Sequence, residues 1–325
     1  MIELTKKSPL LKQAWELFEI FIAKGELLQE SLTEEAFTEK VFLNQNKLSC
    51  IGLASPGGEG FAFGCTDFAQ KKNFITLVMV KEEERKKGIG TALLNTLEEK
   101  LLKEQETGGE DWNSKWEISF FNPCTFSWKI PGKQANHPNL PGVDMTSGAS
   151  TFFEKVGYHV FAVQNSYYLS LNDYESSEII VKKKQELEKE GIVFASYDNK
   201  NQPGMKEMLA SFQNPLWEKE ILSEPGKEEG GRNILVPVKE GRVCGFTGPL
   251  DVEKSGRGYF AGIAVDESVR GKGVAKVLFC ELCTGLKNEG ASFMTLFTGE
   301  QNPARKIYEA AGFQIVRSWA DMRKE

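Results

Sequence analysis

The sequence predicts an α+β protein of two tandem domains, each with a mixed, mostly antiparallel sheet flanked by helices. The chain has 325 residues, which favours two domains of ~150 residues over one. A unit of strand, basic turn and helix occurs at Val80–Gly90 and again at Val265–Ala275. The polar, turn-rich stretch 172–177 is typical of a linker. We therefore expect one domain at 1–172 and a second at 178–325.

The composition excludes several classes of protein. The formal charge is −6 and the pI is near 5.4, so a general basic surface for nucleic acid or anionic lipid is not expected. No apolar run approaches the ~18 residues of a membrane span, and the first residues lack the apolar core of a signal peptide. We expect a cytoplasmic protein with neither nucleic acid nor membrane as a partner. The oligomeric state has no signature in the sequence.

The six cysteines predict reduced thiols, because they are scattered and lie mostly in apolar segments. Cys280 and Cys283 have the spacing of metal ligands, but no second pair accompanies them and both histidines are far away in sequence. We expect them to pack within a helix and expect no metal site.

In the first half, apolar periodicity and turn residues predict the elements in order. Pro9 suits the first turn of a helix, Gly25 its end, and Thr33 the cap of the next helix. Turn residues such as Pro56-Gly57-Gly58 separate three strands of an expected antiparallel meander. The expected elements are a strand at 2–6, helices at 9–24 and 33–44, strands at 48–54, 60–68 and 73–80, a helix from Ile89, a strand at 115–121, a helix ending at Gly157, and a closing strand pair near 158–171.

The second half opens with a charged helix and then follows the same order of elements. Gly191 ends that helix, and prolines open the next two. The expected elements are helices at 178–190, 203–212 and 215–222, strands at 192–197, 232–238, 242–250 and 259–265, a helix from Val274 to about Lys287, a strand at 292–298, a helix at 303–311 and a strand at 314–319.

The two basic turns belong to an internal repeat. A shift of 185 residues carries Arg270 and Gly273 onto Arg85 and Gly88. The same shift aligns the apolar stripes of the following helices, Val274, Leu278, Leu282 and Leu286 with Ile89, Leu93, Leu97 and Leu101. Each turn joins glycine-rich backbone to a helix start, which suits the binding of a phosphate group. Because one shift aligns both the turns and the stripes of the helices that follow them, we infer that both copies derive from one functional unit.

The first half carries about 30 extra residues between its turn and the equivalent of Gly312. They fall in a Pro/Gly-rich insert at about 122–146, which is long for a connection and is a candidate lid or interdomain contact. His137 in this insert is a candidate base, although we favour an exposed loop histidine.

These motifs resemble the Gcn5-related N-acetyltransferase (GNAT) superfamily, arranged as two tandem GNAT-like domains. The pyrophosphate-loop signature occurs in both halves, and the second half also has the following motif, Asn302 to Phe313. The resemblance implies an acyl-CoA-binding fold with acetyl-CoA, or another acyl-CoA, as the cofactor. Tandem copies also occur in mycothiol synthase-like and Fem-type transferases, but no motif here selects either.

The resemblance assigns cofactor-binding residues in both halves. The strand before each loop would hold the pantetheine, here Val78, Met79 and Val80, and Ile263, Ala264 and Val265. The loops would hold the pyrophosphate, here Arg85, Lys86, Lys87, Gly88, Ile89 and Gly90, and Arg270, Gly271, Lys272, Gly273, Val274 and Ala275. Asn302 would contact the cofactor, cap a helix, or do both.

The resemblance also makes Tyr308 the general acid, since its ordinary pKa near ~10 makes it a neutral donor at pH 7. The alternative is a core tyrosine. No acidic residue lies on the strand 259–265 to act as a base. Asp251, Glu253 and Glu300 are alternatives, each of which we favour as a surface charge.

In the first half, the positions of Tyr308 and Asn302 are taken by Phe153 and Ser147. A phenylalanine donates no proton, so we expect this half to have lost catalysis. Its loop is intact, and the sequence leaves open whether this half still binds the cofactor. The leading hypothesis is an N-acyltransferase that acts on the amine of a small molecule, with catalysis in the second half. The alternative is a non-catalytic acyl-CoA-binding or regulatory protein.

Overall fold

The computed structural model describes residues 1–108, 112, 116–227 and 231–325. They form two compact units, the first of Met1–Asn165 with Arg317–Glu325 and the second of Ser166–Val316. The chain passes from the first unit to the second within β9 (His159–Ser170) and returns within β16 (Gln314–Lys324). The expected division at 172–178 did not include this return, because strand pairing between distant segments leaves no local pattern in the sequence.

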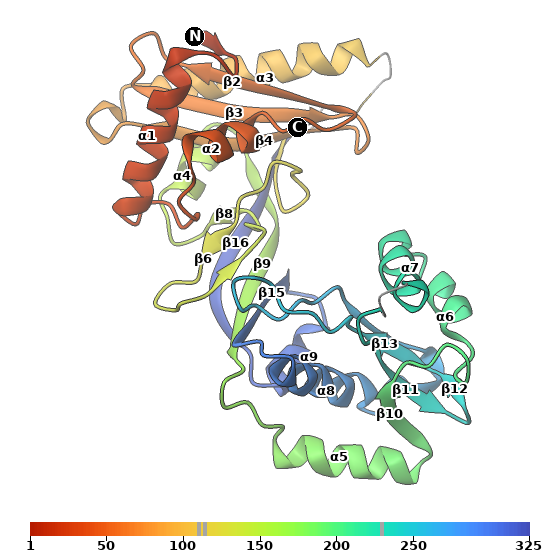
Figure 1. The fold of residues 1–325 in the computed structure, drawn as a ribbon. Coiled ribbons are helices and arrows are strands. Elements are labelled where there is room, and N and C mark those ends of the chain that lie inside the picture. The colour runs from red at the N-terminus through yellow and green to blue at the C-terminus, as the bar shows by residue number, and fades with distance from the viewer. Residues whose placement is uncertain (109–111, 113–115, 228–230) are drawn as a thin grey trace. The chain divides into compact units, whose positions relative to one another are not determined.

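The first unit is a twisted sheet whose early strands follow one another in space (Figure 1). β1 (Ile2–Leu4), β2 (Leu48–Ala54), β3 (Gly60–Asp67) and β4 (Lys72–Val80) pair antiparallel in that order. β5 (Trp116–Ile118) runs parallel to β4, and the last part of β16 runs antiparallel to β5 and to β8 (Val143–Asp144). The sequence-based meander is therefore present. Lys115, the expected start of the next strand, lies outside the described residues.

Helices cover both faces of this sheet. α1 (Pro9–Ala23) and α2 (Glu34–Val41) pack on one face, and α3 (Ile89–Thr107) and α4 (Ala149–Lys155) on the other. Successive side chains of β3 point to opposite faces of the sheet and so contribute to the cores on both faces. Phe61 and Phe63 face α1 and α2, whereas Ala62 faces α3. Thr33 caps α2 by accepting a hydrogen bond from the N–H of Ala36, at 3.1 Å.

The insert 122–146 is ordered by backbone pairing rather than by a core of its own. It contains β6 (Trp128–Lys129) and β7 (Asn136–His137), which pair antiparallel, and ends in β8. The N–H of Lys129 donates at 2.8 Å to the carbonyl of Leu28, which lies in the loop between α1 and α2. His137 is 6 % exposed, so our interpretation of it as an exposed histidine was wrong.

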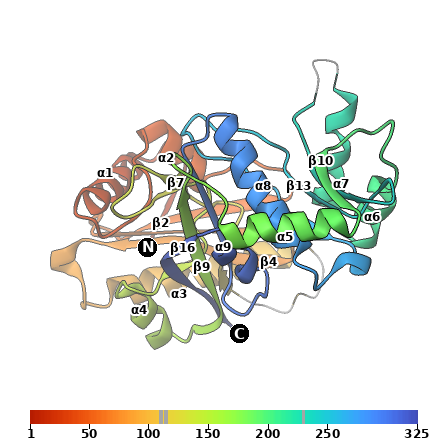
Figure 2. The ribbon, with the colours of Figure 1, turned by 90° about the horizontal axis from the view of Figure 1, so that it is seen from below.

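The second unit also has a sheet with helices packed against it, and an additional helix precedes its first strand. Its elements are α5 (Glu178–Lys189), β10 (Ile192–Ser196), α6 (Met205–Ser211), α7 (Pro215–Leu222), β11 (Leu235–Lys239), β12 (Arg242–Val243), β13 (Gly245–Thr247), β14 (Ile263–Val265), α8 (Val274–Asn288), β15 (Phe293–Gly299) and α9 (Arg305–Ala310). β10, β11, β13 and β14 are successive neighbours, and β15 lies beside β9. α5 crosses and contacts α8 (Figure 2).

Several strand predictions differ from the structure. The stretch 242–250 forms two short strands, β12 and β13, and only the end of 259–265 is a strand. Gly262 has a φ of 154° where the chain enters β14, and β14 pairs with β13 over only three residues on each strand. The expected strand pair near 158–171 is the single long strand β9, because its two halves serve the two units.

No helix in the described ranges is both long and apolar enough to cross a membrane. Within the same ranges, no group of three or more His, Cys, Asp or Glu side chains has an arrangement suited to a metal ion. Cys280 and Cys283 are buried on α8 in the apolar core of the second unit, where burial raises the pKa of the Cys283 thiol.

Candidate functional site

The two basic turns share one geometry, residue for residue. After β4 the N–H of Lys81 donates to Glu59 O at 2.8 Å, and after β14 the N–H of Asp266, 185 positions later, donates to Cys244 O at 2.9 Å. A single 3₁₀ turn follows in each case, at Glu82–Glu84 and at Glu267–Val269. The repeat that the sequence indicated is therefore also a repeat of backbone hydrogen bonds.

Each turn ends in a glycine that starts the next helix. Gly88 and Gly273 have φ of 87° and 90°, a left-handed conformation that side chains disfavour. Neither helix start receives a side-chain cap, so the first N–H groups of α3 and α8 remain as donors at the positive end of a helix dipole. Both turns are thus suited to an anion.

The loop arginines fold back onto the preceding strands. Nε of Arg85 donates to Val80 O at 3.1 Å, and Nε of Arg270 donates to Val265 O at 3.3 Å. The guanidinium of Arg85 is also paired with Glu26 at 2.5 Å and lies 5.0 Å from the ring centre of Phe21. The arginines therefore help to close the turns as well as adding positive charge.

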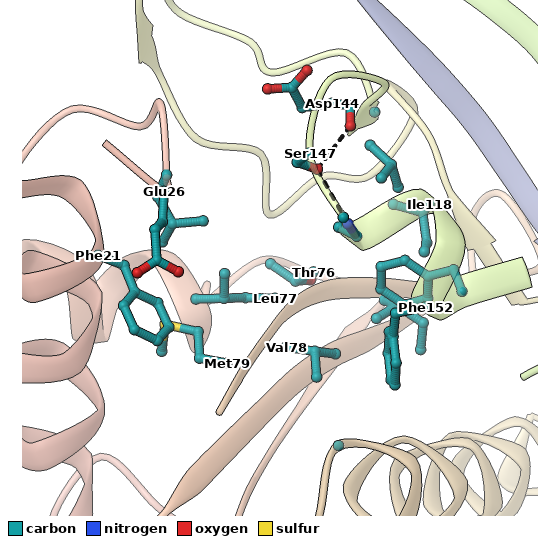
Figure 3. Close-up of a pocket in the computed structure, with 18 of the residues that line it drawn as sticks. Phe21, Glu26, Thr76, Leu77, Val78, Met79, Ile118, Asp144, Ser147 and Phe152 are labelled. Carbon is teal, nitrogen blue, oxygen red and sulfur yellow. Dashed lines mark hydrogen bonds between the residues drawn. The ribbon is translucent and has the colours of Figure 1, made fainter. Parts of the chain in front are cut away.

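A cavity of about 800 Å³ opens beside the first of these turns. Many of its lining residues are those that the sequence assigned to cofactor binding in the first half: Val78, Met79, Val80, Arg85, Lys86, Gly88 and Gly90. Lys87 and Ile89 are not among the lining residues. Figure 3 shows Leu77, Val78 and Met79 of β4 along one side of the cavity.

The cavity exists because β4 and β5 separate. They pair in parallel at Asn73 with Trp116 and at Phe74 with Glu117, and beyond these pairs the two strands diverge. The space between them is lined by residues 75–80 of β4 and by Ile118 and Ser119. Apolar side chains complete the wall: Phe21 from α1, Phe126 and Leu140 from the insert, and Trp319 from β16.

The start of α4 forms the opposite side of the cavity. The hydroxyl of Ser147 donates to Asp144 O at 2.8 Å and accepts from the N–H of Ala149 at 3.3 Å, as Figure 3 shows. Phe153 lines the cavity and is 8 % exposed. Ser147 and Phe153 are the residues that the sequence aligned with Asn302 and Tyr308, so this wall offers a hydroxyl but no phenol.

In the second unit, Tyr308 lies in an aromatic cluster and is 7 % exposed. Its ring centre is 5.0 Å from that of Phe279, 6.0 Å from Phe260 and 6.1 Å from Tyr167. Burial, with a contribution from Tyr167, raises the pKa of Tyr308 to about 12. The phenol therefore keeps its proton at neutral pH.

The side chain of Asn302 has the capping role that we considered for it. Its Oδ1 accepts a hydrogen bond from the N–H of Ala304 at 3.0 Å, directly before α9. The carboxylates that we weighed as bases include two that are paired with cations, Asp251 with Arg232 at 2.8 Å and Glu253 with Arg257. Glu300 is exposed.

The turn of the second unit has neighbours that the motif did not indicate. Lys272 is paired with Glu190 at 3.3 Å, at the end of α5. A Cβ added to Gly273 would lie 3.2 Å from the side chain of Lys183, also on α5. The helix before the second sheet thus contributes charge at this turn, a role for which its sequence carries no particular signal.

Comparison with known proteins agrees with this geometry. The sequence model of the acetyltransferase (GNAT) family matches residues 14–110 and 203–313, which together are more than half of the chain. The chain belongs to the acetyltransferase (GNAT) family. Its two matches, one in each unit, make it a tandem GNAT protein.

Solved structures share the fold of this GNAT protein at low sequence identity. The GCN5-related glucosamine N-acetyltransferase region of a fungal multi-domain GH3 β-N-acetylglucosaminidase has a TM-score of 0.66 at 16 % identity, over 99 % of this chain and 37 % of that one. This chain therefore spans little more than a third of that protein.

Two further structures are similar over nearly their whole lengths. A GCN5-related N-acetyltransferase from Sphaerobacter thermophilus has a TM-score of 0.59 at 16 % identity, over 100 % of this chain and 95 % of that one. A tandem GNAT protein from the clavulanic acid biosynthesis pathway has a TM-score of 0.56 at 14 % identity, over 100 % and 97 %. No curated protein matches the sequence.

Proposed function

We propose that this GNAT protein is an acyl-CoA-dependent N-acyltransferase, with acetyl-CoA as the donor and the amine of a small molecule as the acceptor. The observation that carries the proposal is the cavity of about 800 Å³ against the strand, turn and helix start of the first unit. Its size and largely apolar wall are typical of a small-molecule site.

The residues of each turn fit the diphosphate of an acyl-CoA. A Cβ added to Gly88 in the first turn or to Gly271 in the second would meet nothing within 4 Å, whereas one added to Gly273 would lie 3.2 Å from the side chain of Lys183. Space therefore lies open at Gly88 and at Gly271. The N–H groups that start α3 and α8 would hold the diphosphate, with charge from Lys86 in the first unit and Lys272 in the second. Backbone groups of 78–80 and 263–265 would hold the pantetheine.

When bound, the acyl-CoA supplies an activated thioester carbonyl. In the proposed transfer a C–N bond forms between the acceptor amine and the acyl carbon, and the C–S bond breaks. The amine loses a proton, and the leaving thiolate gains one to become the free thiol. In the second unit we assign that donation to Tyr308, whose pKa of about 12 keeps the phenol protonated at neutral pH.

Calorimetric titration with CoA tests donor binding in each unit. Gly90 and Ala275 are equivalent positions near the starts of α3 and α8, and Gly90 lines the cavity. Leucine is compatible with a helix, but its side chain would occupy the space in front of the turn where the CoA diphosphate is proposed to bind. We expect two equivalents of CoA for the wild type and one for either Gly90→Leu or Ala275→Leu. Unchanged binding in Gly90→Leu would contradict a donor site in the first unit.

Turnover is tested by release of CoA thiol from acetyl-CoA with a panel of primary amines. Tyr308→Phe keeps the ring in its aromatic cluster and removes the proton donor, so we expect kcat to fall by about 10²-fold with little change in KM for acetyl-CoA. An unchanged kcat would remove Tyr308 from the reaction.

A non-catalytic acyl-CoA-binding protein is the second candidate. The observation in its favour is Phe153, which takes the place of the phenol at the cavity of the first unit. This candidate is preferred if CoA binds and none of the amines is acylated.

A further inference from the structure

The cavity of the first unit has a carboxylate and an indole side by side on one wall. β8 and β16 pair antiparallel with Asp144 directly opposite Trp319. Residues that face each other in this way project from the same side of a sheet. Both side chains accordingly line the cavity, and Figure 3 shows Asp144 across the cavity from Thr76 and Leu77 of β4.

The Asp144 carboxylate is oriented through one of its two oxygens. Oδ1 accepts hydrogen bonds from the N–H and the hydroxyl of Thr146, both at 2.9 Å. Arg317 lies 3.7 Å from the same oxygen, and its guanidinium also donates to the Thr146 hydroxyl at 2.5 Å. Within the described parts of the chain, no residue donates to Oδ2. That oxygen is available to a ligand.

The charged residues of the cavity separate into two groups. Three cations line it, Arg85 and Lys86 of the turn and Lys155 of α4, and they suit the phosphates of the donor. The acidic lining residues are Glu26 and Asp144, and Glu26 is engaged by Arg85 at 2.5 Å. Asp144 has Arg317 3.7 Å from its Oδ1, and its Oδ2 remains for a cationic group of a ligand.

We propose that Asp144, through Oδ2, binds the ammonium group of an amine ligand in the cavity of the first unit. An ammonium gains from a charge-assisted hydrogen bond to a carboxylate. Phe126 and Leu140 of the insert line the same cavity, so the ligand class is a primary amine with an apolar body. The inference rests on the proposed function, and it gives the insert 122–146 a role in ligand specificity.

Calorimetric titration of the CoA-saturated protein tests this subsite without turnover. The probes are aryl-alkyl primary amines, such as 4-phenylbutylamine, each compared with the alcohol of the same skeleton. We expect the wild type to prefer an amine by at least about tenfold. Asp144→Asn keeps an oxygen for the Thr146 bonds but loses the charge, so the preference should fall to about onefold.

Glu26→Gln is the matched control, because it removes the other lining carboxylate and should leave the preference for the amine intact. CoA binding is measured in every variant and should not change in Asp144→Asn. The inference is overturned if no amine binds the wild type better than its alcohol, or if Asp144→Asn keeps the preference. Loss of CoA binding by the wild type would instead contradict the proposed function.

Discussion

At the scale of single residues, Asp321 is a buried acid for which the sequence has no motif. β16 pairs with β5 at Met322 and with β8 at Ala320, so Asp321 lies where the strand changes partner. It is 1 % exposed, and Gln164 donates to its Oδ2 at 2.8 Å. Burial raises the pKa of Asp321 to about 6.

This shift predicts a specific dependence of stability on pH. The folded protein holds the proton of Asp321 up to about pH 6, whereas the unfolded chain releases it near pH ~4. The folded state is therefore favoured below pH ~4, and that advantage, roughly 3 kcal/mol, is lost as the pH rises from about 4 to 6.

Asp321→Asn removes this titration and isolates its effect. We expect the free energy of unfolding of the variant, relative to wild type, to rise by roughly 3 kcal/mol between pH 4 and pH 7. Urea unfolding of both proteins at several pH values measures this difference in the free energy of unfolding. Taking the difference cancels the contributions of the other titrating groups, which both proteins share. A difference that stays constant with pH would contradict the assigned pKa.

At the scale of elements, the two turns show how local chemistry fixes a functional geometry. Gly88 and Gly273 each adopt the left-handed backbone conformation between a strand and a helix. The sequence predicted both turns because this conformation requires glycine and because the apolar stripes of the next helices agree in register.

Replacing these glycines should destabilise the protein. Alanine at either position must adopt a positive φ, at a cost of about 1 kcal/mol, which corresponds to a fall in Tm of about 2–4 °C for a unit of this size. Gly90→Ala is the control, because Gly90 is helical and its added Cβ would lie 3.4 Å from Phe152. Calorimetric melting measures all three, and equal shifts would argue against strain at the turns.

At the scale of the whole molecule, the chain returns to complete its first unit. Residues 317–325 belong to that unit, and Trp319, Ala320 and Met322 are at most 1 % exposed. The far end of the sequence therefore supplies Trp319 to the wall of the cavity, and Ala320 and Met322 to the core that packs against α3. The expected boundary at 172–178 lies close to the break at 165–166 but leaves out the return of residues 317–325 to the first unit.

Fragments of the chain test whether the first unit needs the returning residues 317–325. A fragment of residues 1–172 lacks three buried side chains of its core, so we expect no cooperative thermal transition. Residues 1–172 joined by a flexible linker to residues 317–325 should melt cooperatively, as followed by near-ultraviolet circular dichroism. The same fusion with Trp319→Gly is the control and should melt at a lower temperature. Cooperative melting of 1–172 alone would show that the returning strand is dispensable.

The sequence by itself determined what local rules control. Periodicity predicted the helices and the meander, and glycine and proline located the turns. The shift of 185 residues identified the internal repeat, whose motifs resemble the GNAT superfamily. Each of these depends on residues close together in the chain, such as Gly88 and the stripe from Ile89.

Only the tertiary structure decided which distant residues meet. The return of β16, the separation of β4 from β5 that opens the cavity, the burial of Tyr308 and the pairing of Asp144 with Trp319 all join segments far apart in sequence. Strand pairing and burial depend on the free energy of the complete packed unit, so no single segment carries a pattern that specifies them.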